Sequence, residues 1–197
     1  MICHPTQSAV KQKGLTLIEI MVTLAVLAIV LTVAIPSFSS LVIGNRLTAQ
    51  ANELLAGLSL ARTEAIKQNR NMIFCHSADG LTCSAAPAAG WQGWLVRSNN
   101  DNTPVASGNL NAAQLSVRSS DSVAGSVFNG ISHAIRFSPQ GVVRNASADT
   151  VLNAVLRVCT SASVEPNTRD IQIRSGGRIR VTSLNVASAC PQPANPS

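Results

Sequence analysis

The residues best suited to chemistry lie near the end of the chain, where arginines flank a pair of glycines. Gly176 and Gly177 predict a tight hairpin turn, and Arg178 and Arg180 follow it two positions apart. Because alternate residues of a strand face the same way, both side chains are expected on one face, where Arg174 could join them across the hairpin. The planar donor fork of arginine suits phosphate oxygens. Two or three such forks would hold a nucleic-acid backbone regardless of base sequence, although arginines on an edge strand also block unwanted strand pairing.

A second feature is a carboxylate inside an apolar segment near the N-terminus. Residues 15–35 number 21 and carry one charge, Glu19. About 20 apolar residues span a bilayer as a helix, and a carboxylate there costs on the order of 2.5–3.5 kcal/mol. We therefore expect a partner for Glu19. Lys11 and Lys13 precede the segment and the next basic residue is Arg46, so the positive-inside rule places the N-terminus in the cytoplasm and the rest outside.

The cysteines beyond the apolar segment predict disulfides. Four of the five, Cys75, Cys83, Cys159 and Cys190, lie on the expected outer side of the membrane, where disulfides persist. Four cysteines allow three pairings, and proximity in the sequence favours Cys75–Cys83 and Cys159–Cys190. The alternative is a metal site, but Cys75-His76 followed by Cys83 lacks the paired short spacings of a zinc site. We expect no metal and no other cofactor.

Arrangements typical of enzymes are missing from the sequence. His76 and His133 are lone histidines, and Cys75 and His76, adjacent on an expected strand, would point to opposite faces. Serine is abundant, but the Gly-x-Ser-x-Gly elbow of the hydrolases does not occur. The sequence therefore disfavours a catalytic function.

Positive charge gathers in the last third of the chain. Of 15 lysines and arginines, Lys11 and Lys13 precede the apolar segment, which leaves 13 against 9 acidic residues and a formal charge of +4. The segment from Arg136 to the end contains seven arginines and three acidic residues, which also gives a formal charge of +4. Such a surplus suits an anionic partner without defining it.

The scaffold expected for these residues is a long helix followed by a β-rich part, an α+β fold. Between residues 37 and 70 apolar residues recur at helical spacing and continue the apolar segment as one helix of about 55 residues. The expected buried stripe consists of Leu47, Ala51, Leu54, Leu55, Leu58, Ala61, Ala65 and Ile66. Beyond Asn71 the period changes, and short β-type runs alternate with loops. The expected strands are Met72–Cys75, Trp94–Arg97, Leu115–Arg118, His133–Phe137, Leu152–Cys159, Asp170–Arg174 and Arg178–Thr182, forming a mostly antiparallel sheet on which the helix packs.

The N-terminal residues resemble the processing signal of type IV pilins and pseudopilins. Lys11-Gln-Lys-Gly14 is followed by Leu15-Thr-Leu-Ile-Glu19, and no small-residue signal-peptidase site follows the apolar run. The resemblance implies that a dedicated prepilin peptidase cuts between Gly14 and Leu15 and methylates the new N-terminus. The family most often has Phe at the position of Leu15. Glu19 becomes the fifth mature residue, which the family pairs with the N-terminal amine of a neighbouring subunit.

Later motifs resemble the GspH/FimT-type minor pseudopilins. Residues 134–143, Ala-Ile-Arg-Phe-Ser-Pro-Gln-Gly-Val-Val, are similar to a strand–turn–strand signature of that family, and residues 174–181, Arg-Ser-Gly-Gly-Arg-Ile-Arg-Val, to its Gly-Arg-x-Arg ending. Residues 61–65, Ala-Arg-Thr-Glu-Ala, add a helix motif. The resemblance implies a cleaved leader (1–14), a transmembrane and assembly helix segment (15–36), an amphipathic helix (37–70) and a periplasmic β-rich domain (71–197).

The resemblance also implies a function. The chain would be a single-pass inner-membrane protein that joins other major and minor pilins through its N-terminal helix and enters the pilus near its tip. In the FimT branch, which serves DNA uptake in natural transformation, the Gly-Arg-x-Arg element contacts DNA. The resemblance implies that Gly177, Arg178 and Arg180 contact DNA, with Arg174 beside them. The expected partner is double-stranded DNA. Two alternatives stay open: a structural subunit that primes pilus assembly, and a minor pseudopilin of a type II secretion system.

Overall fold

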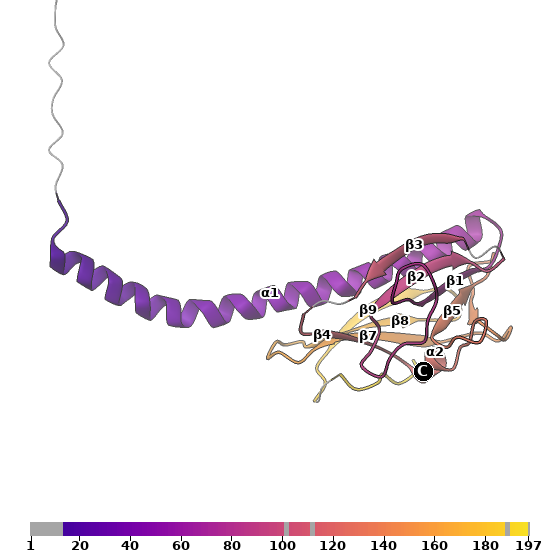
Figure 1. Cartoon of the computed structure of the whole chain (residues 1–197). Helices are drawn as coiled ribbons and strands as arrows, with labels where there is room; N and C mark the ends of the chain where they lie inside the picture. Colours follow the sequence, from indigo (N-terminus) through magenta and orange to yellow (C-terminus); the bar gives the residue numbers. More distant parts are fainter. Residues whose placement is uncertain (1–13, 101–102, 111–112, 188–189, 197) are drawn as a thin grey trace, which may run out of the picture. The chain divides into compact units, whose positions relative to one another are not determined.

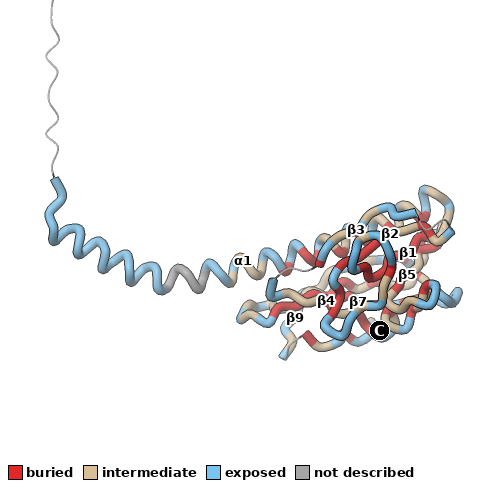
Figure 2. Tube along the Cα trace, in the orientation of Figure 1, coloured by how far each residue is buried: buried red, intermediate tan, exposed pale blue. Residues whose placement is uncertain are grey.

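The computed structural model describes residues 14–100, 103–110, 113–187 and 190–196, without the side chains of residues 33–37 (Figure 1). The chain divides into two compact units, which meet between Ser39 and Ser40. Helix α1 (Leu17–Lys67, 51 residues) begins in the first unit and ends in the second. Between residues 17 and 32 its apolar side chains are exposed, as the pale tube in Figure 2 shows.

The sequence predicts a spanning segment at residues 15–36, whereas no helix among the described residues is both long and apolar enough to cross a membrane.

The end of α1 follows from its sequence. Asn69 adopts a left-handed conformation with φ 49°, and the amide of Arg70 donates to the carbonyl of Ala65 at 3.2 Å. This is the hydrogen bond of a Schellman motif, in which a left-handed residue stops the helix and satisfies a carbonyl of its last turn. The predicted end at Asn69–Asn71 is confirmed.

Within the second unit α1 buries one stripe against the sheets. Six predicted residues are at most 1% exposed: Leu47, Ala51, Leu54, Leu58, Ala61 and Ala65. Leu55 is half-buried and Ile66 is 50% exposed, so both were wrongly assigned to the buried stripe. Gly57 allows close packing, because a Cβ there would lie 3.0 Å from the Trp94 ring and 3.1 Å from the Phe74 ring.

The β-rich part forms two sheets rather than one, and every neighbouring pair of strands is antiparallel. The five-stranded sheet has the order β3 (Pro104–Asn109), β2 (Gly93–Ser98), β1 (Met72–His76), β5 (Ala134–Phe137), β6 (Val143–Asn145). The four-stranded sheet has the order β4 (Leu115–Ser119), β7 (Ala154–Thr160), β8 (Thr168–Ile173), β9 (Ile179–Leu184). All seven predicted strands are present, within two residues at either end.

Strand β3 and a short helix, α2 (Asp121–Ala124), lie where loops were expected. Strand β6 begins at the last residue of the expected strand–turn–strand motif (134–143). Strand β3 has the sequence Pro-Val-Ala-Ser-Gly-Asn, so it lacks the alternation of apolar and polar residues that identifies a strand. It forms by pairing with the buried strand β2 at the edge of the sheet, where proline is tolerated.

Both predicted disulfides are present, Cys75–Cys83 and Cys159–Cys190, with Cα atoms 5.7 Å and 5.6 Å apart. The second bridge fastens the C-terminal tail to the four-stranded sheet. The tail adds hydrogen bonds of its own, for example from Arg157 Nη1 to the carbonyl of Pro191 at 3.2 Å. Among the described residues no group of histidines, cysteines and carboxylates has the arrangement of a metal site.

Candidate nucleic-acid interface

The β8–β9 connection is the predicted hairpin. Arg174 and Arg178 close it: the amide of Arg174 donates to the carbonyl of Arg178 at 2.9 Å. The amide of Gly177 donates back to the carbonyl of Arg174 at 2.8 Å, and Gly177 has φ +78°. A three-residue loop with a left-handed glycine at its end is a common hairpin geometry. The sequence Ser175-Gly176-Gly177 therefore has the residue type that this turn requires at its last position.

The tip of the hairpin docks on the second unit's other elements. The carbonyl of Ser175 accepts from the amide of Val143 at 2.9 Å. Gly177 is buried, and a Cβ there would overlap the carbonyl oxygen of Gly141 and lie 2.7 Å from Arg62 Nε. The turn is thus fixed between the β5–β6 turn and helix α1, so the direction of the arginines that follow is fixed as well.

Arg178, which precedes β9, and Arg180, on β9, face away from the core. Ile179 and Val181 are partly buried and pack on the core of the second unit, and the alternating residues Arg178 and Arg180 are exposed. Arg180 lies opposite Gln172 on β8. Arg174, half-buried, lies opposite Arg178 at the closing pair of the hairpin. The structure therefore places the three predicted arginines at one corner of the outer face of the four-stranded sheet.

Most other arginines of the last third have partners. Arg157 forms two hydrogen bonds of 2.7 Å with Asp170, and Arg136 and Arg144 share Asp149 at 2.8 and 3.5 Å. No ion pair joins Arg178 or Arg180 to any residue in the described part of the chain. Arg178 and Arg180, beside the hairpin turn, therefore carry positive charge that no described carboxylate neutralises.

Arg62 is a further basic residue at this site, and sequence reasoning noted it only as part of a helix motif. Its Nε atom is buried without a hydrogen-bond partner. It lies between the two turns, because a Cβ at Gly141 would be 3.1 Å from it and one at Gly177 2.7 Å. Only the tertiary fold brings α1 to the hairpin, so no local sequence signal could have shown this contact.

The predicted processing residues lie at the start of the described chain. A Cβ at Gly14 would meet no atom within 4 Å, and Leu15 is 72% exposed. Glu19 closes a capping box with Thr16: the amide of Glu19 donates to Thr16 Oγ1 at 3.3 Å, and the amide of Thr16 to Glu19 Oε2 at 3.5 Å. Such reciprocal bonds start a helix. The carboxylate thus has a role within its own chain, which the sequence reading overlooked. Lys11 and Lys13 lie outside the described residues.

Comparisons with known families agree with these features. Residues 50–177 match the family described as Type II transport protein GspH, and residues 10–35 match the prokaryotic N-terminal methylation motif. The chain belongs to the GspH family. It is a minor pilin or pseudopilin with an N-terminal methylation motif and a pilin-like α+β fold. No curated protein sequence matches it.

Solved structures with a similar fold include a minor pilin and a minor pseudopilin. The type IV minor pilin FimU of Pseudomonas aeruginosa matches in two crystal forms. One match has 19% identity, covers 70% of this chain and 89% of FimU, and has a TM-score of 0.49. The other has 18% identity, coverage of 69% and 92%, and a TM-score of 0.47. The minor pseudopilin EpsH of the Vibrio cholerae type 2 secretion system matches with 10% identity, coverage of 70% and 96%, and a TM-score of 0.47.

The family match has a boundary that bears on the hairpin. It ends at residue 177, so Gly177 and Arg174 lie inside it, while Arg178 and Arg180 lie just beyond. The match therefore covers the turn that positions the arginines and leaves the arginines themselves to be judged on their geometry.

Proposed function

We propose that this GspH-family protein is a minor type IV pilus subunit that binds the backbone of double-stranded DNA through its β8–β9 hairpin during natural transformation. The observation that carries the proposal is the pair Arg178 and Arg180, exposed at the start of the edge strand β9 and without an acidic partner in the described residues. Arginine forks on phosphate oxygens fix a protein on a duplex without reading its sequence, which suits the uptake of any DNA.

The proposed site favours duplex backbone over single strands. Single-strand binding without sequence preference relies on aromatic side chains on which bases stack, and strands β8 and β9 contain none. With two or three phosphates contacted, the slope of log affinity against log salt is about −1.8 to −2.7. Binding by one copy is therefore weak, and several copies along one filament would strengthen it.

Processing and location form part of the same proposal. The methylation motif supports cleavage by a prepilin peptidase between Gly14 and Leu15, after which residues 15–36 anchor the chain in the inner membrane with its second unit in the periplasm. Exposed apolar residues cover this segment, among them Leu17, Ile18 and Leu24, and they supply the surface that packs on other major and minor pilins. No catalytic step is included.

The test is DNA binding with and without the two arginines. Fluorescence anisotropy at low salt should show saturable binding of a duplex to the full chain, and R178A/R180A should abolish it. R46A is the matched control, because Arg46 is exposed on α1 far from the hairpin in sequence. Unchanged binding by R178A/R180A, or an equal loss in R46A, would reject the site.

The second candidate is a minor pseudopilin of a type II secretion system, which the description of the matching family favours. A chain with this function binds no DNA, and deleting its gene blocks protein secretion while transformation continues. The third alternative is a purely structural pilus subunit. Deleting its gene removes pili, and producing the R178A/R180A variant in the deletion strain restores pili as well as the wild-type chain does.

A further inference from the structure

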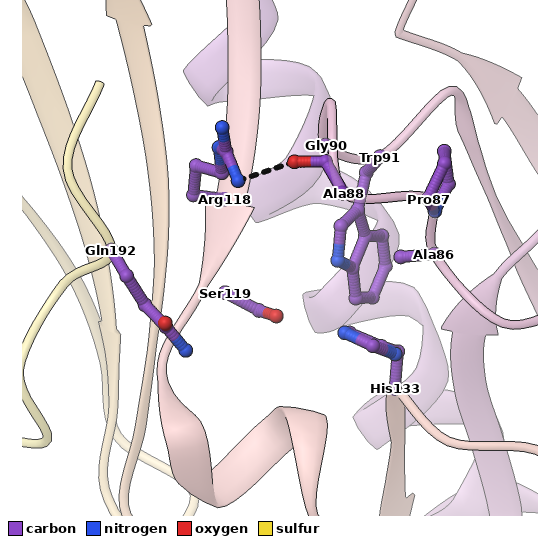
Figure 3. A pocket seen from close by; sticks show the side chains of 9 residues that line it. All are labelled: Ala86, Pro87, Ala88, Gly90, Trp91, Arg118, Ser119, His133 and Gln192. Carbon is purple, nitrogen blue, oxygen red and sulfur yellow. Dashed lines mark hydrogen bonds between the residues drawn. The ribbon is translucent and has the colours of Figure 1, made fainter. Parts of the chain in front are cut away.

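A pocket of about 340 Å³ lies on the second unit and shares no residue with the β8–β9 hairpin. Its lining comes from four places in the chain: the β1–β2 loop, the end of β4, the residue before β5 and the C-terminal tail. The lining residues are Ala86, Pro87, Ala88, Gly90, Trp91, Arg118, Ser119, His133 and Gln192 (Figure 3).

Two polar side chains of this pocket, Trp91 and Arg118, can only donate hydrogen bonds. Trp91 is 4% exposed, and its Nε1 has no hydrogen-bond partner; Figure 3 shows this nitrogen directed toward the open space between Arg118 and His133. The Nε of Arg118 is also buried and unpartnered, and Ser119 points its hydroxyl toward the same space (Figure 3). None of the nine lining residues is acidic. A buried donor that meets no acceptor costs about 1–3 kcal/mol, so the lining favours an acceptor-rich guest.

The donors are held in place by the fold. The amide of Trp91 donates to the carbonyl of Val117 at 2.8 Å, and Arg118 Nη1 donates to the carbonyl of Ala88. Gly90 has φ +120°, and a Cβ there would lie 2.5 Å from the oxygen of Val117. The loop is therefore fastened to β4 by two hydrogen bonds. A preformed site loses less entropy when a ligand binds.

The other wall is fixed as well. Gln192 donates to Asp121 Oδ1 at 2.7 Å, and the Cys159–Cys190 bridge holds the tail that carries it. The ring of His133 packs edge-on against Trp91, with centroids 6.3 Å apart. Burial, and secondarily the nearby His76, lowers the pKa of His133. At neutral pH the cation of the pocket is therefore Arg118.

We propose that this pocket binds a small organic carboxylate, with Arg118 and Trp91 Nε1 as donors to its oxygens. The guanidinium fork matches the two oxygens of a carboxylate, and a pocket of a few hundred Å³ suits a small molecule. Ala86, Pro87 and the indole ring of Trp91 offer apolar surface to the carbon body of such a ligand. Inorganic phosphate lacks that body and binds more weakly.

The two tryptophans of the chain make a test with an internal control. The indole N–H signals of the ¹⁵N-labelled full chain are followed by NMR during titration with benzoate. The signal of Trp91 should move saturably, whereas that of Trp94, which donates to Glu53 Oε1 at 3.3 Å, should stay. Benzamide, of the same shape without the charge, and inorganic phosphate should each bind at least tenfold more weakly. Equal binding of benzamide or of phosphate would overturn the carboxylate class.

Substitutions of Arg118 test whether this residue binds the carboxylate. R118Q should weaken benzoate binding about tenfold or more, since a hydrogen bond to a charged group is lost, and R118K should recover part of it. R46Q, on the exposed face of α1, should bind like the wild type. An unchanged Trp94 signal in R118Q shows that the fold is kept. No saturable movement of Trp91 in the wild type, or full binding by R118Q, would overturn the proposal.

Discussion

Two arginines on the outer face of the four-stranded sheet have different roles because different residues surround them. Arg157 on β7 is largely buried, forms two 2.7 Å bonds with Asp170 and donates to the tail at Pro191. Arg180 on β9 lies exposed opposite Gln172. The carboxylate of Asp170 is already engaged by Arg157. Arg180 therefore keeps its charge for a partner outside the chain, whereas Arg157 serves the fold.

The largest effect is expected from breaking the buried pair. Asp170→Asn leaves Arg157 buried without its counter-charge, which costs about 3–5 kcal/mol of stability. The control is Asp149→Asn, because Asp149 is 80% exposed and exposed pairs contribute about 1 kcal/mol or less. Urea denaturation measures both variants. Equal losses in the two would show that Arg157 is no more dependent on its partner than a surface arginine.

The hairpin turn should come next in size. Gly177→Ala places a Cβ against the carbonyl of Gly141 at a left-handed φ of +78°, and we expect a loss of about 1–3 kcal/mol together with weaker DNA binding. Gly176→Ala is the matched control, since a Cβ there meets no atom within 4 Å. If both variants retain stability and DNA binding, the turn does not position the arginines.

Single arginine substitutions should affect DNA binding alone. R178Q and R180Q should each reduce the magnitude of the salt slope by about 0.9, the share of one phosphate contact. Their stability should stay within about 0.5 kcal/mol of the wild type, because neither side chain is buried. Anisotropy titrations at several salt concentrations provide the slope. A slope that stays constant while stability falls would assign these arginines to the fold, as for Arg157.

The sequence was most informative where structure is local. The period of α1, its end at Asn69 and the turn at Gly177 follow from neighbouring residues, and the two disulfides join cysteines that are near in sequence. Strand β3 exists only through its pairing with β2. The contact of Arg62 with the hairpin, and the meeting of Trp91 with Arg118 in one pocket, depend on which strands join which sheet. The local sequence pattern does not encode which strands pair. For this reason one sheet was predicted where the structure has two.

The smallest expected effect is a change of stability with pH that leaves DNA affinity unchanged. Burial is the main cause that lowers the pKa of both His76 and His133 below the ordinary 6.5, so the unfolded chain binds more protons than the folded one below that value. Stability should therefore fall as the pH drops from about 6.5 to 5, by about 1 kcal/mol or less for each histidine. Asp79 and Glu64, whose pKa values are lowered mainly by hydrogen bonds, act only below about pH 4.5.

Arginine side chains in general carry a fixed positive charge in proteins. DNA affinity per folded molecule should then remain constant while urea midpoints decline, and H133Q should flatten the decline relative to the wild type. An affinity that rises toward pH 5 together with the loss of stability would place a histidine at the DNA site. In that case the buried and the exposed regions of this domain would not be separable in the way that Arg157 and Arg180 indicate.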